Sequence, residues 1–323
     1  MRPDVTPFHH APTGSWTYVV ADPASKSAVV VDPVLDYDWR SARTSTRSAE
    51  AVAAHCDQHG LAVRWILETH AHADHLSAAQ YLKSRLGASV AIGEGIRAVQ
   101  ATFKGIFGLG DEFVPNGSHF DRLLEDGETL DAGGLAVRVI AVPGHTNDSV
   151  AFLVGDALFV GDTVFMPDSG SARCDFPGGD ARALYRSVRR LYELPADTRV
   201  FVCHDYSPGG RSARCETTIA EQKAANTHIR DGIDEDEYVA MRRARDATLD
   251  VPNLLIPAVQ VNIRAGHLPP PERDGVRYLR VPMPCSAEIE PPMRSTMSNT
   301  ALLTSCQRAM KSAVSPPTGW LTL

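Results

Sequence analysis

The sequence has no long apolar run and no excess of positive charge, and these absences exclude two kinds of partner. No stretch of the 323 residues approaches the roughly 18 consecutive apolar residues of a membrane-spanning helix. Lys and Arg number 32 against 39 Asp and Glu, a net charge of -7, whereas nucleic-acid binding needs clustered basic residues. The N-terminus also lacks a charged segment followed by an apolar one. We therefore expect no secretory signal, no membrane or nucleic-acid partner, and a cytoplasmic protein.

The cysteines form no Cys-x-x-Cys pair, which argues against a disulfide framework and against a structural zinc ribbon. The six are Cys56, Cys174, Cys203, Cys215, Cys285 and Cys306. We expect reduced and mostly buried thiols in a reducing compartment. The glycine-rich stretch 105–111, GIFGLGD, lacks the strand and the helix-opening glycines of a dinucleotide site, so we expect no nucleotide cofactor.

Runs of β-branched residues alternate with amphipathic segments along the chain. The predicted strands and hairpins cover residues 16–33, 62–70, 128–146, 149–165 and 198–206. The predicted helices cover residues 48–59, 75–87 and 181–194, and most of the sequence from there to Asp246. Because strands arrive as hairpins, a simple βαβ repeat does not fit. We predict an α/β fold in which two packed sheets have helices outside them.

Three further segments complete the organisation. Residues 105–116 are predicted to be an irregular loop near the mouth of the site, and residues 233–246, IDEDEYVAMRRARD, a solvated helix with an acidic start and basic later turns. One catalytic domain is predicted over residues 1–285. Residues 286–323, rich in Ser, Thr, Pro and Met, are predicted to be a disordered tail.

Seven imidazole and carboxylate side chains follow apolar runs, at the points where predicted strands end. They are His70, His72, Asp74 and His75 in THAHADH, His145 in PGHT, Asp162 in GDT and His204 in CHDY. Enzymes built on sheets collect their chemistry from such strand ends, so we expect these side chains to converge. Imidazole and carboxylate without thiolate suit zinc, iron or manganese.

Two local expectations accompany this set. Asp74 stands where the helix predicted over 75–87 begins, so it could also cap free backbone N–H groups. Cys203 precedes His204 on a strand, and alternation should point its thiol away from the His204 side, toward the core.

The motifs THAHADH, PGHT, GDT and CHDY, in this order, resemble the metallo-β-lactamase superfamily. The resemblance extends from about Phe8 to Pro284 and implies an αββα sandwich with the metal at the sheet edges. The superfamily includes lactamases, glyoxalase II-type thioesterases, nucleases and mononuclear iron persulfide dioxygenases. Membership alone does not choose among these activities.

Residues 166–188 are similar to the persulfide dioxygenase branch, and closest to the bacterial group often labelled β-lactamase hydrolase-like. An Arg, one variable residue and then Asp-Phe follow GDT, here Arg173-Cys174-Asp175-Phe176, and Tyr206 comes directly after CHD. Relatives carry Thr where this chain has Cys174. In this branch one Fe(II) is held by two histidines and one aspartate, which implies His70, His145 and Asp162 as ligands here. His72, Asp74, His75 and His204 would then orient ligands and water, or hold a second metal.

The activity implied is a sulfur dioxygenase that oxidises glutathione persulfide, or a similar low-molecular-weight persulfide, with O₂ to sulfite. All seven ligands of a dinuclear zinc hydrolase are present too, so an enzyme of the glyoxalase II or thioesterase type stays open. A non-catalytic metal-binding or sulfur-sensing protein is the third hypothesis. A homodimer is compatible with the sequence, and a rhodanese-type sulfurtransferase is the expected partner.

Three side chains near the implied iron have two interpretations each. Arg173 could anchor a substrate carboxylate by a bidentate contact or pair with Asp175. Tyr206 could donate a hydrogen bond to substrate or oxygen, or simply pack. Cys174, beside a cation that favours thiolate, could relay a persulfide, although inert packing is the expected state.

Overall fold

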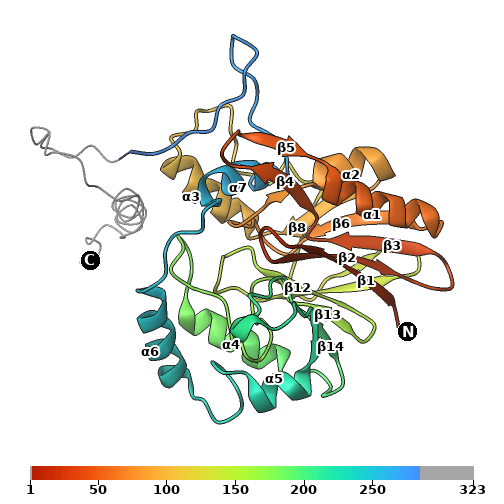
Figure 1. The fold of residues 1–323 in the computed structure, drawn as a ribbon, viewed down its shortest axis with the longest axis vertical. Coiled ribbons are helices and arrows are strands. Elements are labelled where there is room, and N and C mark those ends of the chain that lie inside the picture. The colour runs from red at the N-terminus through yellow and green to blue at the C-terminus, as the bar shows by residue number, and fades with distance from the viewer. Residues whose placement is uncertain (1, 284–323) are drawn as a thin grey trace, which may run out of the picture.

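The computed structural model of the chain describes residues 2–283, so the tail predicted over 286–323 lies outside the described residues. Two six-stranded sheets pack face to face, with helices on both outer sides (Figure 1). The first sheet has the order β1 (Asp4–His10), β2 (Ser15–Ala21), β3 (Ser27–Val31), β6 (Ala62–Glu68), β8 (Ser89–Gly93) and β9 (Arg122–Leu124). The second has the order β10 (Thr129–Asp131), β11 (Ala136–Ala141), β12 (Val150–Val154), β13 (Ala157–Phe159), β14 (Arg199–Phe201) and β15 (Glu216–Thr218). The predicted αββα sandwich is confirmed.

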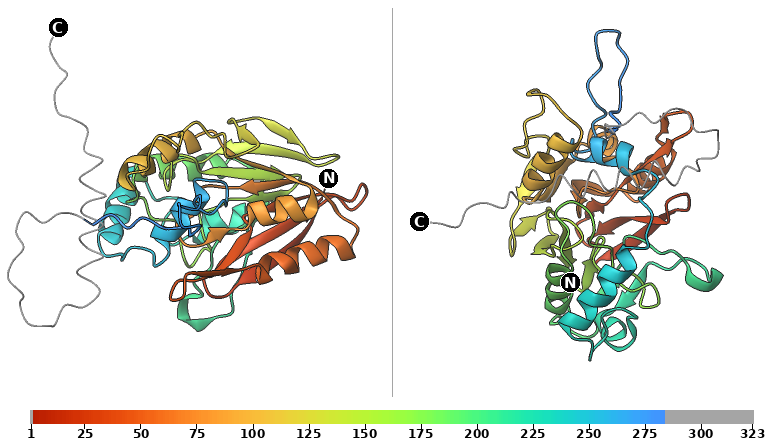
Figure 2. Two further views of the ribbon diagram at one scale, coloured as in Figure 1. Left: turned by 90° about the horizontal axis from the view of Figure 1, so that it is seen from above. Right: turned by 90° about the vertical axis from the view of Figure 1, so that its left-hand side faces the viewer.

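The outer layers are helical on both sides, as two further views also show (Figure 2). The first sheet is covered by α1 (Arg47–Gln58), α2 (Ala79–Leu86), α3 (Ile96–Ile106) and α7 (Leu255–Asn262). The second sheet is covered by α4 (Ala181–Leu191), α5 (Ile219–Ala225) and α6 (Glu235–Asp246). None of the described helices is long and apolar enough to cross a membrane.

Alternation along the strands decides which side chains meet between the two sheets. In β2, Tyr18 and Val20 enter the core shared with the second sheet, whereas Val19 faces the helices. Phe152 and Phe159 fill the same shared core from the second sheet. Because both faces of these strands are buried, they are nearly continuous apolar runs in the sequence.

The ends of the central strands gather at one edge of the sandwich. β3 and β6 are parallel, as are β13 and β14, and β11 runs in the direction of β13 because both pair antiparallel with β12. The sheets are tied together at this edge: Trp16 N donates to Cys203 O at 2.8 Å, and Val150 N donates to Thr69 O at 2.9 Å. The loops that carry the candidate ligands therefore start from neighbouring points.

The helix predicted from His75 begins four residues later, at Ala79. Leu76–Ser77 instead forms β7, which pairs with β4 (Val34–Asp38), itself paired with β5 (Arg43–Ser45). The helix is preceded by Ala78, so the capping role expected for Asp74 was wrong. Gly87 ends α2 as predicted, in a left-handed conformation with φ of 70°.

Three other predictions of local structure were wrong or incomplete. Helices α3 and α7 were missed; from Pro257 to Asn262 every residue of α7 is buried, which removes the amphipathic period. Residues 207–215 contain only a short 3₁₀ helix at Pro208–Gly210 and no α-helix, and Glu216–Thr218 joins the second sheet as β15. Helix α6 is not simply solvated, because Tyr238 and Arg242 are almost fully buried.

Phe152 is the largest side chain that β12 places in the core between the sheets, and replacing it by Ala should leave a cavity there. We expect the free energy of unfolding to fall by about 3–5 kcal/mol, measured by chemical denaturation. Val114→Ala is the control: Val114 is 49% exposed, and its loss should change stability by no more than about 0.5 kcal/mol. Equal losses for the two variants would contradict this description of the core.

Candidate metal centre

Two imidazoles and one carboxylate from three loops meet at the edge where the strands end. His70, His145 and Asp162 offer donor atoms that all lie within 4.8 Å of one another. His145 Nε2 lies 3.6 Å from Asp162 Oδ2. All three residues are buried, so water competes little for their donor atoms. The three ligands implied by the resemblance are therefore brought together.

The other four candidates form a second group beside the first. His72, Asp74, His75 and His204 also have donor atoms within 4.8 Å of one another. His204 Nε2 lies 3.2 Å from Asp74 Oδ2 and 3.3 Å from Asp162 Oδ1. Because Asp162 approaches both groups, it is placed to serve either one metal ion or two.

The donor atoms of this cluster fit a metal ion because most of them lack any other partner. Buried atoms without a hydrogen-bond partner include His70 Nε2, His72 Nδ1, His75 Nε2, His204 Nε2 and Asp162 Oδ1. Leaving one buried polar atom unpaired costs about 1–3 kcal/mol. Several such atoms gathered in two adjoining groups indicate that a cation is their missing partner, since bound metal would satisfy them.

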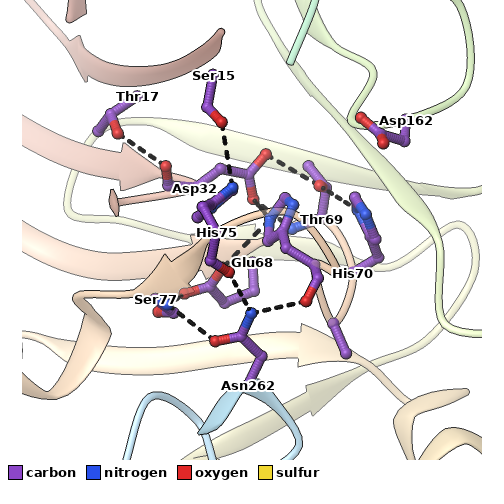
Figure 3. Close-up of polar contacts among 12 residues, drawn as sticks. Ser15, Thr17, Asp32, Glu68, Thr69, His70, His75, Ser77, Asp162 and Asn262 are labelled. Carbon is purple, nitrogen blue, oxygen red and sulfur yellow. Dashed lines mark hydrogen bonds and ion pairs between the residues drawn. The ribbon is translucent and has the colours of Figure 1, made fainter. Parts of the chain in front are cut away.

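The ring of His70 is oriented by a chain of hydrogen bonds that begins at Asp32 (Figure 3). Thr69 Oγ1 donates to Asp32 Oδ2 at 2.9 Å, so the same hydroxyl accepts from His70 Nδ1 at 3.0 Å. The lone pair of His70 is thereby left on Nε2, the unpartnered atom. Burial, followed by the charges of His72 and His145, holds the pKa of His70 well below its usual value, which keeps the ring neutral.

The ring of His145 is fixed in the same way from the other sheet. Its Nδ1 lies 2.8 Å from the carbonyl oxygen of Arg173. A carbonyl only accepts, so Nδ1 carries the proton and Nε2 faces Asp162 with its lone pair. The loop that holds Arg173 therefore selects the tautomer of His145 that can bind a metal.

His72 is held between two buried carboxylates. Its Nε2 lies 3.0 Å from Asp32 Oδ1 and 3.5 Å from Glu68 Oε2. Burial alone would lower the pKa of His72, but the charge of Asp32 and the hydrogen bonds to its neighbours together outweigh burial and raise that pKa well above its usual value. For Asp32, burial is outweighed by His72 and by the hydrogen bonds from Thr69, and its pKa is lowered. His72 thus has Nε2 directed to carboxylates, with Nδ1 free to face the metal.

The loop carrying the first four candidates is supported from behind by helix α7. Asn262 Nδ2 donates to the carbonyl oxygens of His72 and His75, both at 2.8 Å, and Ser77 N donates to Asn262 Oδ1 at 2.8 Å. Figure 3 shows Asn262 beneath this loop. Ala71 N also donates to the buried carboxylate of Asp148 at 2.8 Å. A change in the conformation of this loop would therefore break several of its backbone hydrogen bonds.

The structure pairs Arg173 with Asp175, one of the two arrangements considered above. Arg173 Nε and Nη2 donate to the two carboxylate oxygens at 2.6 and 2.9 Å, and Nη1 donates to Asp250 O at 2.7 Å. Cys174 is buried, and burial followed by the charge of Asp246 raises the pKa of its thiol. The arginine beside it does not favour the thiolate. Inert packing is the role that this environment supports.

Tyr206 lies at the mouth of the centre, 61% exposed. Its ring stacks on His204 with centroids 5.9 Å apart and meets the edge of Phe165 at 5.6 Å. Together with His145, Asp162 and Phe176, it lines a cavity of about 450 Å³. A small molecule that enters this cavity would contact His145 and Asp162 of the two-histidine, one-aspartate group directly.

Several residues that build the centre were missed in the sequence, and one expectation about it was wrong. Asp32 directly follows the apolar strand β3, so its place in the sequence matches the pattern from which the ligands were predicted. No sequence pattern identifies Thr69 or Asn262, because their roles depend on contacts across the fold. Cys203 does not point away from the site: its sulfur lies within 4.8 Å of donor atoms of His204 and Asp162.

The chain is similar in sequence to a known family and to several known proteins. The profile of the family described as Metallo-beta-lactamase superfamily matches residues 10–204. A probable metallo-hydrolase of Burkholderia pseudomallei is 51% identical over 286 residues, 85% of this chain and 97% of the relative. The Beta-lactamase hydrolase-like protein of Xylella fastidiosa is 50% identical over 281 residues, 87% of this chain but only 65% of that protein.

Two further matches carry the name ETHE1. The mitochondrial persulfide dioxygenase ETHE1 of Homo sapiens is 28% identical over 255 residues, 78% of this chain and 84% of the relative. The crystal structure of ETHE1 from Myxococcus xanthus has a TM-score of 0.65 and 29% identity, and the match covers 82% of this chain and all of that one.

Replacing Asn262 by Ala should loosen the loop that presents the first group of ligands. We expect metal affinity to fall about 10- to 100-fold, as when other residues that orient ligands are removed, measured by competition with a chelator. Gln260→Ala is the matched control, because Gln260 lies on the same helix but bonds to Arg280 and Ile256. If both variants lose affinity equally, α7 acts only through general stability.

Proposed function

The chain belongs to the metallo-β-lactamase superfamily, and within that superfamily we propose that it is a persulfide dioxygenase that uses one Fe(II). Its substrate is glutathione persulfide or a similar low-molecular-weight persulfide. The proposed ligands are His70, His145 and Asp162. His72, Asp74, His75 and His204 orient ligands and water around them.

One observation carries this proposal: the first group consists of two imidazoles and one carboxylate, and two of its members, His145 and Asp162, line one cavity. This ligand set with open positions is typical of non-haem Fe(II) oxygenases. Two further facts support it: the loop of Arg173 and Asp175 is bonded to His145, and relatives named ETHE1 match most of the chain.

The proposed reaction consumes one molecule each of persulfide, O₂ and water. The outer sulfur of the persulfide is oxidised by four electrons, which O₂ accepts. The sulfur–sulfur bond breaks, so the products are the thiol, sulfite and two protons. Bound at this site, iron would supply the redox change that such a reaction needs and that zinc lacks.

The residues of the chain have distinct tasks in this proposal. Arg173 and Asp175 form a rigid pair whose backbone sets the tautomer of His145. Tyr206 stands at the cavity mouth and is proposed to donate a hydrogen bond from its hydroxyl to the bound substrate or to oxygen. Phe165 and Phe176 line the cavity with apolar surface, which limits the access of water.

A dinuclear zinc hydrolase of the thioesterase type is the second candidate, and one observation favours it. The second group of donors is complete, and Asp162 approaches both groups. Two metal ions held by the two groups, with Asp162 between them, would supply an activated hydroxide for hydrolysis. The relative from Burkholderia pseudomallei is itself named a probable metallo-hydrolase. A rhodanese-type sulfurtransferase remains our proposed partner under the dioxygenase hypothesis only.

Metal identity separates the two candidates. Protein loaded anaerobically with iron should consume O₂ on addition of glutathione persulfide and form sulfite in equal amount, whereas zinc-loaded protein should do neither, because zinc has no accessible redox change. An oxygen electrode and a sulfite assay measure this. If neither sample consumes O₂ and the zinc sample hydrolyses a glutathione thioester, the hydrolase hypothesis replaces the dioxygenase.

Asp162→Ala tests the site rather than the class of reaction. Loss of the carboxylate that approaches both groups should reduce bound metal to background and turnover by at least about 1,000-fold, measured by elemental analysis and activity. Asp168→Ala is the control, since Asp168 is exposed and pairs with Arg211 outside the metal groups. Full activity in Asp162→Ala would mean that the centre lies elsewhere.

A further inference from the structure

Three arginines line the cavity beside the metal centre: Arg173, Arg242 and Arg245. Arg173 is committed to Asp175 and to Asp250 O. Arg242 pairs with Asp246, with Nη2 at 2.6 Å from Oδ1. Within residues 2–283, the guanidinium of Arg245 makes no ion pair or side-chain hydrogen bond. One positive charge of the cavity wall is therefore available to a ligand.

The last turn of α6 is fixed in place, which defines where Arg245 stands. Arg242 is 1% exposed, and its Nη1 donates to Ser171 O at 2.9 Å while its Nε donates to Asp246 Oδ1 at 2.9 Å. Asp246 Oδ2 in turn accepts from Cys174 N at 2.9 Å. The helix is thereby joined to the loop that orients His145. Arg245, one turn beyond Arg242, is exposed on a rigid support.

The charges around the cavity are unevenly distributed. Its lining carboxylates are Asp74 and Asp162, and both belong to the metal groups. Apolar side chains, among them Phe165, Phe176 and Leu249, form much of the remaining wall. A ligand that fits this surface has a metal-binding atom at one end, a nonpolar middle and an anionic group. A volume of about 450 Å³ is in the range of small-molecule sites.

We propose that Arg245 is the specificity-determining residue of this site and binds a carboxylate of the substrate while the sulfur end faces the metal ligands. The inference rests on the proposed function for its substrate, glutathione persulfide, a peptide thiol derivative that carries carboxylates. A guanidinium can hold a carboxylate through two parallel hydrogen bonds, which gives orientation as well as affinity. Arg173 then acts through His145 rather than on the substrate.

The first test compares Arg245→Gln with Arg243→Gln in the iron-loaded enzyme. Arg243 is a neighbouring exposed arginine of the same helix, but it lines a different cleft, near Asp180. For Arg245→Gln we expect KM for glutathione persulfide to rise about 10- to 100-fold, the effect of one charged hydrogen-bonded contact. Its kcat should stay within about 3-fold, and Arg245→Lys should recover part of the loss. Equal KM values in the two Gln variants would overturn the proposal.

The second test does not depend on turnover. Calorimetry under anaerobic conditions measures the binding of glutathione itself, and of its dimethyl ester, to the metal-loaded wild type and both Gln variants. We expect Arg245→Gln to weaken glutathione but not the ester. If glutathione binds equally to wild type and Arg245→Gln, or does not bind to wild type, the inference fails. If binding depends on Arg245 but no O₂ is consumed, the dioxygenase fails while the carboxylate site stands.

Discussion

The buried carboxylate of Asp32 is the contact on which the rest of the metal centre depends. It accepts hydrogen bonds from Thr69 N, at 2.7 Å, and from the Thr69 hydroxyl. It also lies 3.0 Å from His72 Nε2. One side chain after β3 thus fixes the start of the loop after β6 and, through Thr69, the ring of His70. A buried charge is costly unless it is paired and hydrogen-bonded. Asp32 satisfies both conditions, so the loop has one favourable arrangement.

The second sheet contributes the other half of the centre by the same physical means. His145 is oriented by the Arg173 carbonyl, and the segment that carries Arg173 is bonded in turn to α6 through Arg242 and Asp246. Ligands from the two sheets meet because backbone hydrogen bonds join the sheets at this edge. His70 and His145 therefore each have Nδ1 bonded to protein, which leaves Nε2 of each ring for the metal.

The same seven donors are compatible with one metal ion or with two. The two groups of donors differ in the protein atoms that surround them. His70, His145 and Asp162 form a group of their own, whereas His72 has its Nε2 directed to Asp32 and Glu68. The cavity joins the first group to an arginine-rich wall. Helix α6, which appears in the sequence to be a charged surface helix, supplies that wall because its buried face packs against the loop of the site.

The sequence by itself determined the layered fold, the two sheets and all seven candidate ligands, because each ligand follows an apolar strand and the motifs keep a fixed order. It also identified the pairing options of Arg173. Only the tertiary structure decided which ligands share a group, which atom of each ring is free, and that Asn262 and α6 support the loops. These facts depend on contacts between segments up to 190 residues apart, as between Asn262 and His72, and local residue patterns carry no record of such contacts.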